Sequence, residues 1–347
     1  MKLEIEPAAN PALEQQVRRQ LDNLTKPPGS LGRLEELVVQ YALARGNARP
    51  PLGRKRIYVF CADHGVAAEG VSAYPAAVTA QMVRNFAGGG AAINVLCRQF
   101  GIETRIVDMG VNAVFEPELG VVNCKTGCGT GNFTRAAAMS AAQARQAIEA
   151  GIALAREAAA ESCDLLGAGE MGIGNTTAAA ALAAALTGRD PGEMAGLGTG
   201  ITAAQLERKA EVIRRALALH RLETSRPLEA LAAVGGFEIA GMAGLMLGAA
   251  AARLPVVVDG FISSAAALVA ARLNERVLPY LFFSHCSAER GHRALLGELG
   301  AQPLLSLDLR LGEGTGAALA MAMIEAAARL SEQMATFDSA GVAGPVR

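Results

Sequence analysis

A glycine-rich stretch in the middle of the chain, LLGAGEMGIGNTT at residues 165–177, combines residue types that could bind a phosphate. Gly167, Gly169 and Gly172 match the G-x-G-x-x-G pattern that is typical of dinucleotide-binding turns. Glu170 stands inside this pattern, and the Gly-Lys-Ser/Thr ending of a triphosphate-binding loop is missing. The stretch therefore indicates a phosphate site without a lysine of its own.

The glycine pattern predicts, as one alternative, a Rossmann-type NAD-dependent oxidoreductase. Such an enzyme needs an acidic residue about 20 positions further on, at the end of a second strand, to bind a ribose hydroxyl. Asp190 has this spacing, but it lies in TGRDPGEM, which follows no β-like run. The oxidoreductase is therefore kept only as the second hypothesis.

A mononucleotide site is the first hypothesis for the same stretch. Asn175 and Thr176 open an Ala-rich helix, and the exposed amides of a helix start can hold a monophosphate without a metal. Glu170 would repel a phosphate that it touched, so it should face ribose hydroxyls or a cationic ring. In the alternative, Asn175 or Thr176 only caps the helix.

A second glycine-rich turn, RLGEGTGAALA at residues 310–320, places a single acid between two glycines. The small neighbours Gly312 and Gly314 allow the Glu313 carboxylate to lie close to a ligand. In an apolar, ligand-filled cleft the pKa of this carboxylate would rise, and Glu313 could act as a general base. In the alternative, Glu313 is an acid near a helix start that interacts favourably with the helix dipole.

Strands and helices must alternate along the chain to position these turns. We expect strands in the short apolar runs RIYVFCAD (56–63), ETRIVDMG (103–110), DLLGAGE (164–170), LPVVVDG (254–260), PYLFFSH (279–285) and PLLSLDL (303–309). We expect helices over 140–160, 202–219, 263–273 and 316–334. This alternation predicts an α/β fold, a parallel sheet with helices on both faces.

Nearly every predicted strand ends in a polar or reactive group. These groups are Asp63-His64, Asp108, Glu170, Asp259, Ser284-His285, and Arg310 with Glu313. Ligands of parallel sheets bind outside the carboxyl ends of the strands. The sequence therefore predicts one cleft that several strands line together.

The ends of the chain differ from the middle. Residues 1–50 are helical and polar, with a Pro-Pro-Gly break, whereas the alternating pattern begins at about residue 51. We predict a parallel α/β substrate-binding domain over 51–310. Residues 1–50 and 311–347 are predicted to form a small helical domain.

The composition favours a small-molecule partner. The 347 residues carry a net charge of −1 with charges spread along the chain, so no surface for nucleic acid is expected. The longest apolar stretch, 239–252, is shorter than the roughly 18–20 residues of a membrane span, and the N-terminal residues lack a secretory signal. We therefore expect a cytoplasmic protein. No metal site is expected, because Cys124 and Cys128 have no second ligand pair nearby.

Seven motifs occur in order along the chain and carry a family resemblance. They are TKPPGSLGRLEE (25–36), CADHGV (61–66), GEMGIGNTT (169–177), VGGFEIAGMAG (234–244), LPVVVDGFISSAAAL (254–268), SHCSAERGH (284–292) and RLGEGTGAALAM (310–321). Together they resemble the nicotinate-nucleotide–dimethylbenzimidazole phosphoribosyltransferases, which assemble the lower ligand of cobalamin. The resemblance implies a Rossmann-like sheet, a small helical domain and a homodimer in which each cleft is completed by the neighbour's small domain.

The resemblance also implies the reaction. The 5-phosphoribosyl group would pass from nicotinate mononucleotide to 5,6-dimethylbenzimidazole with inversion at C1′, giving α-ribazole 5′-phosphate and nicotinate. The resemblance implies that no cofactor or metal takes part. The family's general base corresponds to Glu313. Its phosphate and ribose contacts correspond to Glu170, Gly172, Asn175, Thr176, Lys209, Asp259, Gly260 and Ser287.

The pocket for the aromatic base is implied in the same way. Leu311 would border the base, and the segment 70–83, with Tyr74 and Met82, matches the family's base-binding segment. Some family members carry a small polar residue at the position of Tyr74, so other benzimidazoles, azoles or phenols stay open as substrates. Lys209 could instead be a solvated helix lysine. Hydrogen-bonding or structural roles are expected for His64, His285 and His292.

Overall fold

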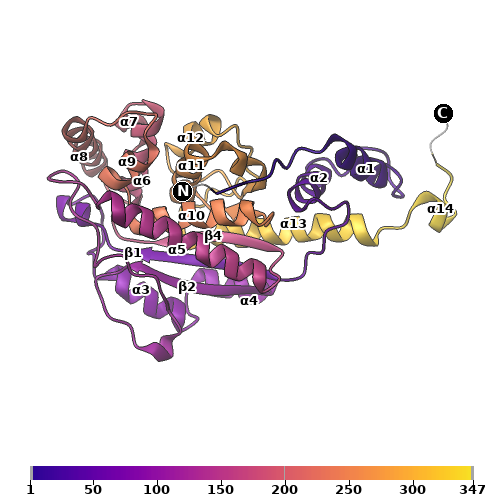
Figure 1. Cartoon of the computed structure of the whole chain (residues 1–347), viewed down its shortest axis with the longest axis horizontal. Helices are drawn as coiled ribbons and strands as arrows, with labels where there is room; N and C mark the ends of the chain where they lie inside the picture. Colours follow the sequence, from indigo (N-terminus) through magenta and orange to yellow (C-terminus); the bar gives the residue numbers. More distant parts are fainter. Residues whose placement is uncertain (1–2, 199, 345–347) are drawn as a thin grey trace.

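A six-stranded parallel sheet forms the centre of the molecule (Figure 1). The computed structural model describes residues 3–198 and 200–344. The strand order is β3-β2-β1-β4-β5-β6. The strands are β1 (Lys55–Ala62), β2 (Ile102–Gly110), β3 (Val122–Asn123), β4 (Leu165–Met171), β5 (Val256–Val258) and β6 (Leu281–Phe283). This order confirms the predicted parallel α/β fold, because the chain reverses its direction of growth between β1 and β4 as in doubly wound folds.

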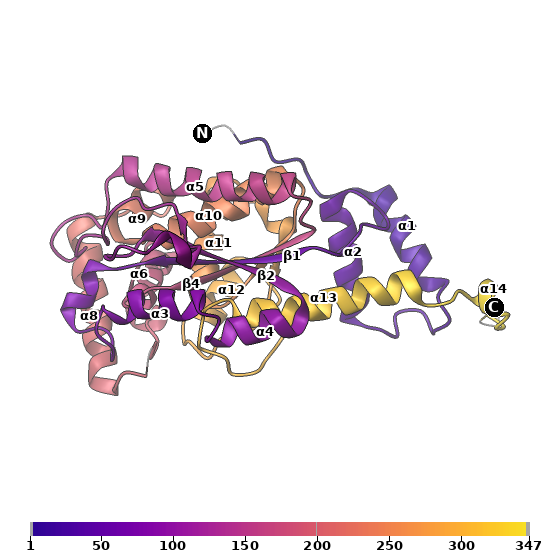
Figure 2. The ribbon, with the colours of Figure 1, turned by 90° about the horizontal axis from the view of Figure 1, so that it is seen from below.

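Helices cover both faces of the sheet, as Figure 2 shows with the sheet seen nearly edge-on. The α-helices are α1 (Pro11–Asp22), α2 (Arg33–Arg45), α3 (Val78–Ala87), α4 (Ala92–Phe100), α5 (Ala141–Ala160), α6 (Asn175–Thr187), α7 (Pro191–Met194), α8 (Ala203–His220), α9 (Pro227–Val234), α10 (Phe237–Ala251), α11 (Phe261–Leu273), α12 (His292–Glu298), α13 (Thr315–Gln333) and α14 (Phe337–Ala340). Short 3₁₀ turns lie at Gly65–Glu69, Pro117–Leu119 and Glu275–Tyr280. The helices expected at 140–160, 202–219, 263–273 and 316–334 correspond to α5, α8, α11 and α13.

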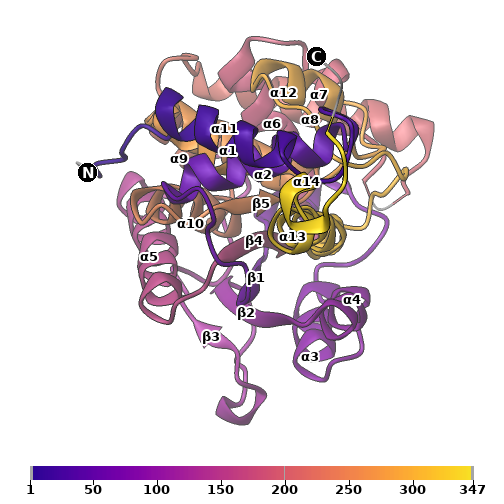
Figure 3. The ribbon, with the colours of Figure 1, turned by 90° about the vertical axis from the view of Figure 1, so that its right-hand side faces the viewer.

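The side chains of β1 point alternately to the two faces of the sheet, and both faces are buried. This explains why the sequence of the strand is almost continuously apolar. Tyr58 and Phe60 join the core on the face covered by α5 and α10. Ile57 and Val59 join the core on the opposite face, which α4 and α13 cover. Figure 3 shows the sheet between these two layers. Both faces are thus buried, as expected for a parallel sheet.

The run at 303–309 is predicted as a strand, and the structure shows only a partial one. The Leu304 and Leu305 amides donate to the carbonyls of Phe283 and Ser284, at 3.0 and 2.9 Å, beside β6. Asp308 then has φ of 53°, a left-handed conformation that ends the extended backbone. The two-residue strand β3 was not predicted, because two residues carry no readable pattern.

The two ends of the chain meet beside the sheet domain. The Thr25 amide donates to the Ala335 carbonyl at 3.0 Å, and the Phe337 amide donates to the Asn23 carbonyl at 3.1 Å. Helix α13 contacts both α2 and the strands β4 and β5, so it runs from the sheet into the α1–α2 region (Figure 2). The division at residues 50 and 311 stays a prediction. Within the described ranges, no helix has the length and apolar character needed to cross a bilayer.

Candidate active site

A cavity of about 450 Å³ opens at the carboxyl end of β4. Among the residues that line it are the sequence-predicted Tyr74, Met82, Glu170, Gly172, Asn175, Thr176, Gly260, Ser287, Leu311 and Glu313. The predicted residues Lys209 and Asp259 lie behind its wall. The cavity thus draws on turns after β4, β5 and β6 and on α3, as the polar strand ends predict.

Two glycines of the G-x-G-x-x-G pattern belong to strand β4 itself and not to a turn. A Cβ atom at Gly169 would collide with the backbone of Glu313 and Gly314, and one at Gly167 would press on Ile57 and Met321. These glycines therefore let the 312–314 turn and α13 approach the strand closely. The pattern therefore does not form a dinucleotide-binding turn. The oxidoreductase hypothesis rested on this pattern and is no longer supported by it.

Glu313 is held in an unusual backbone conformation. Gly312, Glu313 and Gly314 have φ angles of 84°, 63° and 92°, so three consecutive residues are left-handed. Such strain is rare outside glycine and concentrates at functional sites. Glu313 is only 6% exposed, and one of its carboxylate oxygens accepts a weak hydrogen bond of 3.4 Å from the Ile93 amide at the start of α4. Burial raises the pKa of Glu313, and the Ile93 amide opposes this rise.

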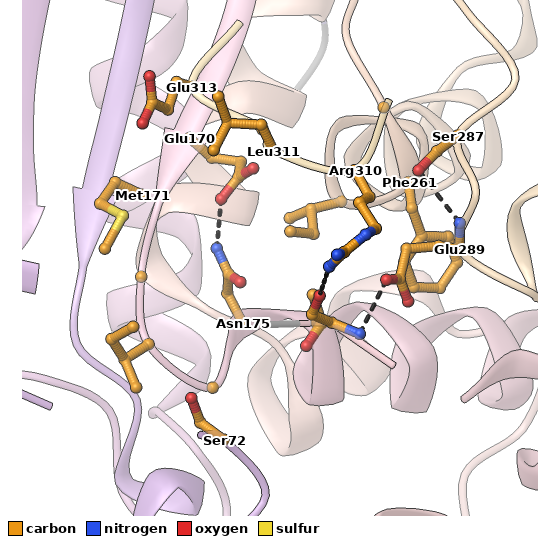
Figure 4. A pocket seen from close by; sticks show the side chains of 18 of the residues that line it. Ser72, Glu170, Met171, Asn175, Phe261, Ser287, Glu289, Arg310, Leu311 and Glu313 are labelled. Carbon is orange, nitrogen blue, oxygen red and sulfur yellow. Dashed lines mark hydrogen bonds between the residues drawn. The ribbon is translucent and has the colours of Figure 1, made fainter. Parts of the chain in front are cut away.

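Glu170 lies on the cavity wall, and the side-chain amide of Asn175 donates a hydrogen bond to its carboxylate (Figure 4). Burial, reinforced by the nearby charge of Asp259, raises the pKa of Glu170 to about 8. Glu170 is therefore mostly protonated at neutral pH and brings little negative charge toward a phosphate. This protonation would reduce the repulsion between Glu170, at the end of β4, and an anion bound at the turn that follows.

The raised pKa of Glu170 predicts a pH dependence of stability. Between its ordinary pKa of 4.5 and the folded value of about 8, the folded protein holds a proton that the unfolded chain has lost. Stability therefore falls as the pH rises through this window. Glu170→Gln removes this titration, so its melting temperature should fall less than that of the wild type between these pH values. The exposed control Glu332→Gln should follow the wild type, and equal slopes for Glu170→Gln would contradict the shift.

The turn between β4 and α6 leaves the helix start without a side-chain cap. Gly174, with φ of 96°, is the N-cap residue, and no side chain caps the helix. Asn175 instead contacts Glu170, so neither Asn175 nor Thr176 acts as the N-cap. The amides of Asn175 and Thr177 donate to the carbonyls of Gly172 and Gly174, so the helix start favours an anion mainly through the positive end of the helix dipole.

Lys209 reaches this turn from helix α8. It is fully buried, and its ammonium donates to the Thr176 hydroxyl at 2.9 Å and to the Gly196 carbonyl at 3.0 Å. Burial lowers the pKa of Lys209 to about 8. The alternative of a solvated surface lysine is wrong, and the positive charge lies directly behind Thr176.

Asp259 lies behind the cavity and faces the start of α13. Its carboxylate accepts hydrogen bonds from the amides of Gly314 at 3.2 Å and Ala317 at 2.9 Å. Burial raises the pKa of Asp259 to about 7. In this position Asp259 holds the turn that carries Glu313, whereas its neighbour Gly260 lines the cavity.

The cavity has an apolar and a polar side. Tyr74, Met82 and Leu311 line it together with Val78 and Met171, and Tyr74 and Leu311 are more than half exposed. In Figure 4, Glu313 and Met171 lie on one side, and Arg310, Glu289 and Ser287 lie on the other. The cavity can therefore contact both an apolar group and a charged or polar group.

Some lining residues were not assigned to the site from the sequence. Arg310 was recognised only as a polar strand end, yet its guanidinium lines the cavity and donates to the Gly198 carbonyl at 3.4 Å. Glu289 is buried, and its carboxylate accepts from the Gly198 amide at 2.8 Å. Glu289 lies in the motif 284–292, and Arg310 lies in the motif 310–321. These motifs are the sequence features that could have assigned both residues to the site. Met171 follows Glu170 directly, and only its position at the strand end marks it.

Three buried histidines make hydrogen bonds to side chains. The His64 Nε2 and Glu238 Oε1 atoms are 2.6 Å apart, and His285 and His292 contact the hydroxyls of Ser284 and Ser264, each at 2.9 Å. Within residues 3–198 and 200–344, no group of three or more His, Cys, Asp or Glu side chains is arranged to hold a metal ion.

Comparison with known proteins identifies the family. The sequence profile of a phosphoribosyltransferase family matches residues 6–342. A nicotinate-nucleotide–dimethylbenzimidazole phosphoribosyltransferase of Chlorobaculum tepidum is 55% identical over 328 residues, which cover 94% of this chain and 93% of that protein. The chain belongs to this phosphoribosyltransferase family. The resemblance and the family assignment are thereby confirmed, and the oxidoreductase alternative has no support.

Further phosphoribosyltransferases of the family agree in sequence and structure. The nicotinate-nucleotide–dimethylbenzimidazole phosphoribosyltransferase of Cupriavidus necator is 55% identical over 331 residues, covering 95% of each chain. The crystal structure of CobT from Thermus thermophilus superposes with a TM-score of 0.92 at 48% identity, covering 96% of this chain and 100% of that one. The phosphoribosyltransferase fold thus extends over nearly the whole chain.

Proposed function

We propose that this phosphoribosyltransferase moves the 5-phosphoribosyl group of nicotinate mononucleotide to 5,6-dimethylbenzimidazole, with inversion at C1′. The products are α-ribazole 5′-phosphate and nicotinate, and the step belongs to assembly of the cobalamin nucleotide loop. The names of the relatives support these substrates. The observation that carries the proposal is a buried acid, Glu313, in the same cavity as the uncapped helix start at Asn175.

The nucleotide occupies the polar side of the cavity in this proposal. Its phosphate lies at the 172–176 turn, where the helix start and the Lys209 ammonium behind Thr176 supply positive potential. The Arg310 guanidinium adds a second positive charge on the wall. Glu170, protonated at neutral pH, can donate a hydrogen bond to a ribose hydroxyl.

The incoming base occupies the apolar side, between Tyr74, Met82 and Leu311. One ring nitrogen attacks C1′ with its lone pair while the bond from C1′ to the pyridinium nitrogen breaks. That bonding pair returns to the pyridine ring, so nicotinate leaves without needing an acid. The second ring nitrogen loses its proton to Glu313, whose raised pKa suits a general base.

We also propose that the active form is a cytoplasmic homodimer. Tyr74 and Leu311 remain more than half exposed at the cavity. A partner's small helical domain would cover this apolar rim and exclude water from the reacting atoms. The test is sedimentation of the purified chain, for which a monomer mass would contradict the dimer.

The function is tested by incubating the purified protein with nicotinate mononucleotide and dimethylbenzimidazole. Chromatography should detect nicotinate and α-ribazole 5′-phosphate in equal amounts. Omission of the base should stop nicotinate release, which separates transfer from hydrolysis. The proposal would be contradicted if neither dimethylbenzimidazole nor any related azole gave the α-riboside.

Tyr74 provides a test of the base pocket. Tyr74→Ser removes apolar surface on the base side, so the KM for dimethylbenzimidazole should rise by roughly 3- to 20-fold. The KM for nicotinate mononucleotide should stay unchanged, because the nucleotide uses the other side. Steady-state kinetics in each substrate measure both constants. Val114→Ala, an 86% exposed position that does not line the cavity, is the control. Equal increases in both KM values would contradict the assignment.

A further inference from the structure

A side-chain hydrogen bond joins helix α3 to the turn at which the nucleotide is proposed to bind. The Thr79 hydroxyl of α3 accepts from the Ile173 amide at 3.1 Å. Thr79 is fully buried, and the two residues are far apart in sequence. The Ile173 amide is therefore satisfied by the protein and is not free to bind a phosphate.

The two partners of this bond lie on elements that line different parts of the cavity. Val78, directly before Thr79, and Met82, one helical turn after it, belong to the apolar side. Gly172 and Gly174, on either side of Ile173, belong to the nucleotide turn. A base that contacts α3 would therefore contact the helix that carries the acceptor of this hydrogen bond. A phosphate that contacts the turn would contact the segment that carries the donor.

The other side of the turn is fixed by rigid neighbours. A Cβ atom at Gly172 would meet the Ala62 carbonyl at the end of β1 and the ring of His64. The His64 ring is in turn held against the Glu238 carboxylate at 2.6 Å in a fully buried pair. The turn therefore rests on the sheet, and Thr79 ties it to the helix that forms the base pocket.

We propose that Thr79 is a positioning residue that couples the two substrate sites. When a bound base restricts the motion of α3, the Thr79 hydroxyl keeps its hydrogen bond to the Ile173 amide. The turn then stays in the conformation that binds the nucleotide. Thermodynamic linkage requires the converse effect of equal size, so the bound nucleotide also favours the base. The proposal rests on the proposed function, since it assumes that both substrates share this cavity.

The first test uses two variants of Thr79. Thr79→Val keeps the shape but removes the acceptor, leaving a buried amide unsatisfied, whereas Thr79→Ser keeps the hydroxyl. The KM for nicotinate mononucleotide should rise about 5- to 30-fold in Thr79→Val. Thr79→Ser should stay near the wild type. Thr187→Val, which loses a threonine hydrogen bond to Ala183 at the far end of α6, should also leave this KM unchanged. An unchanged KM in Thr79→Val would overturn the proposal.

The second test measures the coupling itself, in a Glu313→Gln background, in which turnover is expected to be about 10²–10⁴-fold slower and nucleotide binding unchanged. Calorimetry gives the Kd of nicotinate mononucleotide with and without saturating dimethylbenzimidazole. The base should tighten nucleotide binding at least about 5-fold, and adding Thr79→Val should reduce this factor to about one. A factor that survives Thr79→Val would overturn the proposal.

A third measurement needs no variant of Thr79 and covers the case in which Thr79→Val does not fold. Hydrogen exchange of the Ile173 amide in the wild type should slow when dimethylbenzimidazole alone is added. Unchanged exchange with the base bound would overturn the proposal. Turnover by the wild type is measured first, so that absence of the reaction counts against the proposed function and not against the coupling.

Discussion

Glu313→Gln is expected to lower turnover by about 10²–10⁴-fold, the range for loss of a positioned general base. Glutamine has nearly the same shape as glutamate but cannot accept the proton of the azole. The left-handed turn and the Ile93 contact can both be kept, because an amide oxygen also accepts a hydrogen bond. The loss should therefore appear in kcat.

Binding and pH measurements separate this role from a structural one. The Kd of nicotinate mononucleotide should be unchanged in Glu313→Gln, since Glu313 is assigned to the other substrate. The wild-type rate should increase with pH as Glu313 loses its proton and becomes able to act as a base. Because burial raises the pKa of Glu313, this increase should occur at a higher pH than for an ordinary carboxylate. Glu332→Gln, the same substitution on the exposed end of α13, serves as the control. Full activity of Glu313→Gln would remove Glu313 from the mechanism.

Gly169→Ala is expected to have the second large effect, although residue 169 need not touch a substrate. Its new Cβ atom would collide with the backbone at Glu313 and Gly314, which cannot yield as a flexible side chain can. The 312–314 turn must then move away from β4. A displacement of about 1 Å of a catalytic group can cost about 10²-fold in rate, so kcat should fall by at least that factor.

The measurement is kcat together with the melting temperature of the purified variant. Gly297→Ala is the matched control, because an added Cβ there would meet no atom within 4 Å and the residue lies inside helix α12. That control should keep full activity. If Gly169→Ala retained wild-type kcat, the close approach of β4 to the 312–314 turn would have no part in positioning Glu313.

The sequence predicts the fold and most of the cavity because both depend on local patterns. Apolar runs that alternate with Ala-rich segments are the signature of a covered parallel sheet, and polar residues at strand ends must gather at one edge. Glu170, Asn175 and Glu313 could be placed together on this basis. Their roles as ligand contacts stay predictions.

Other features of the site depend on packing that no local pattern reveals. The positions of Lys209 and Asp259 behind the wall follow from how α8 and α13 dock on the sheet. The bond from Ile173 to Thr79 joins two segments whose contact only the tertiary fold defines. The glycines of β4 were misleading for the same reason, because close packing of strand and turn selects glycine just as a phosphate does.

The most direct test of the proposed mechanism is a crystal structure of Glu313→Gln with nicotinate mononucleotide and dimethylbenzimidazole bound. We predict the 5′-phosphate at the 172–176 turn and the azole between Tyr74 and Leu311. The side chain of residue 313 should lie within hydrogen-bonding distance of the azole nitrogen that does not face C1′. A phosphate bound elsewhere, or an azole remote from residue 313, would contradict the mechanism.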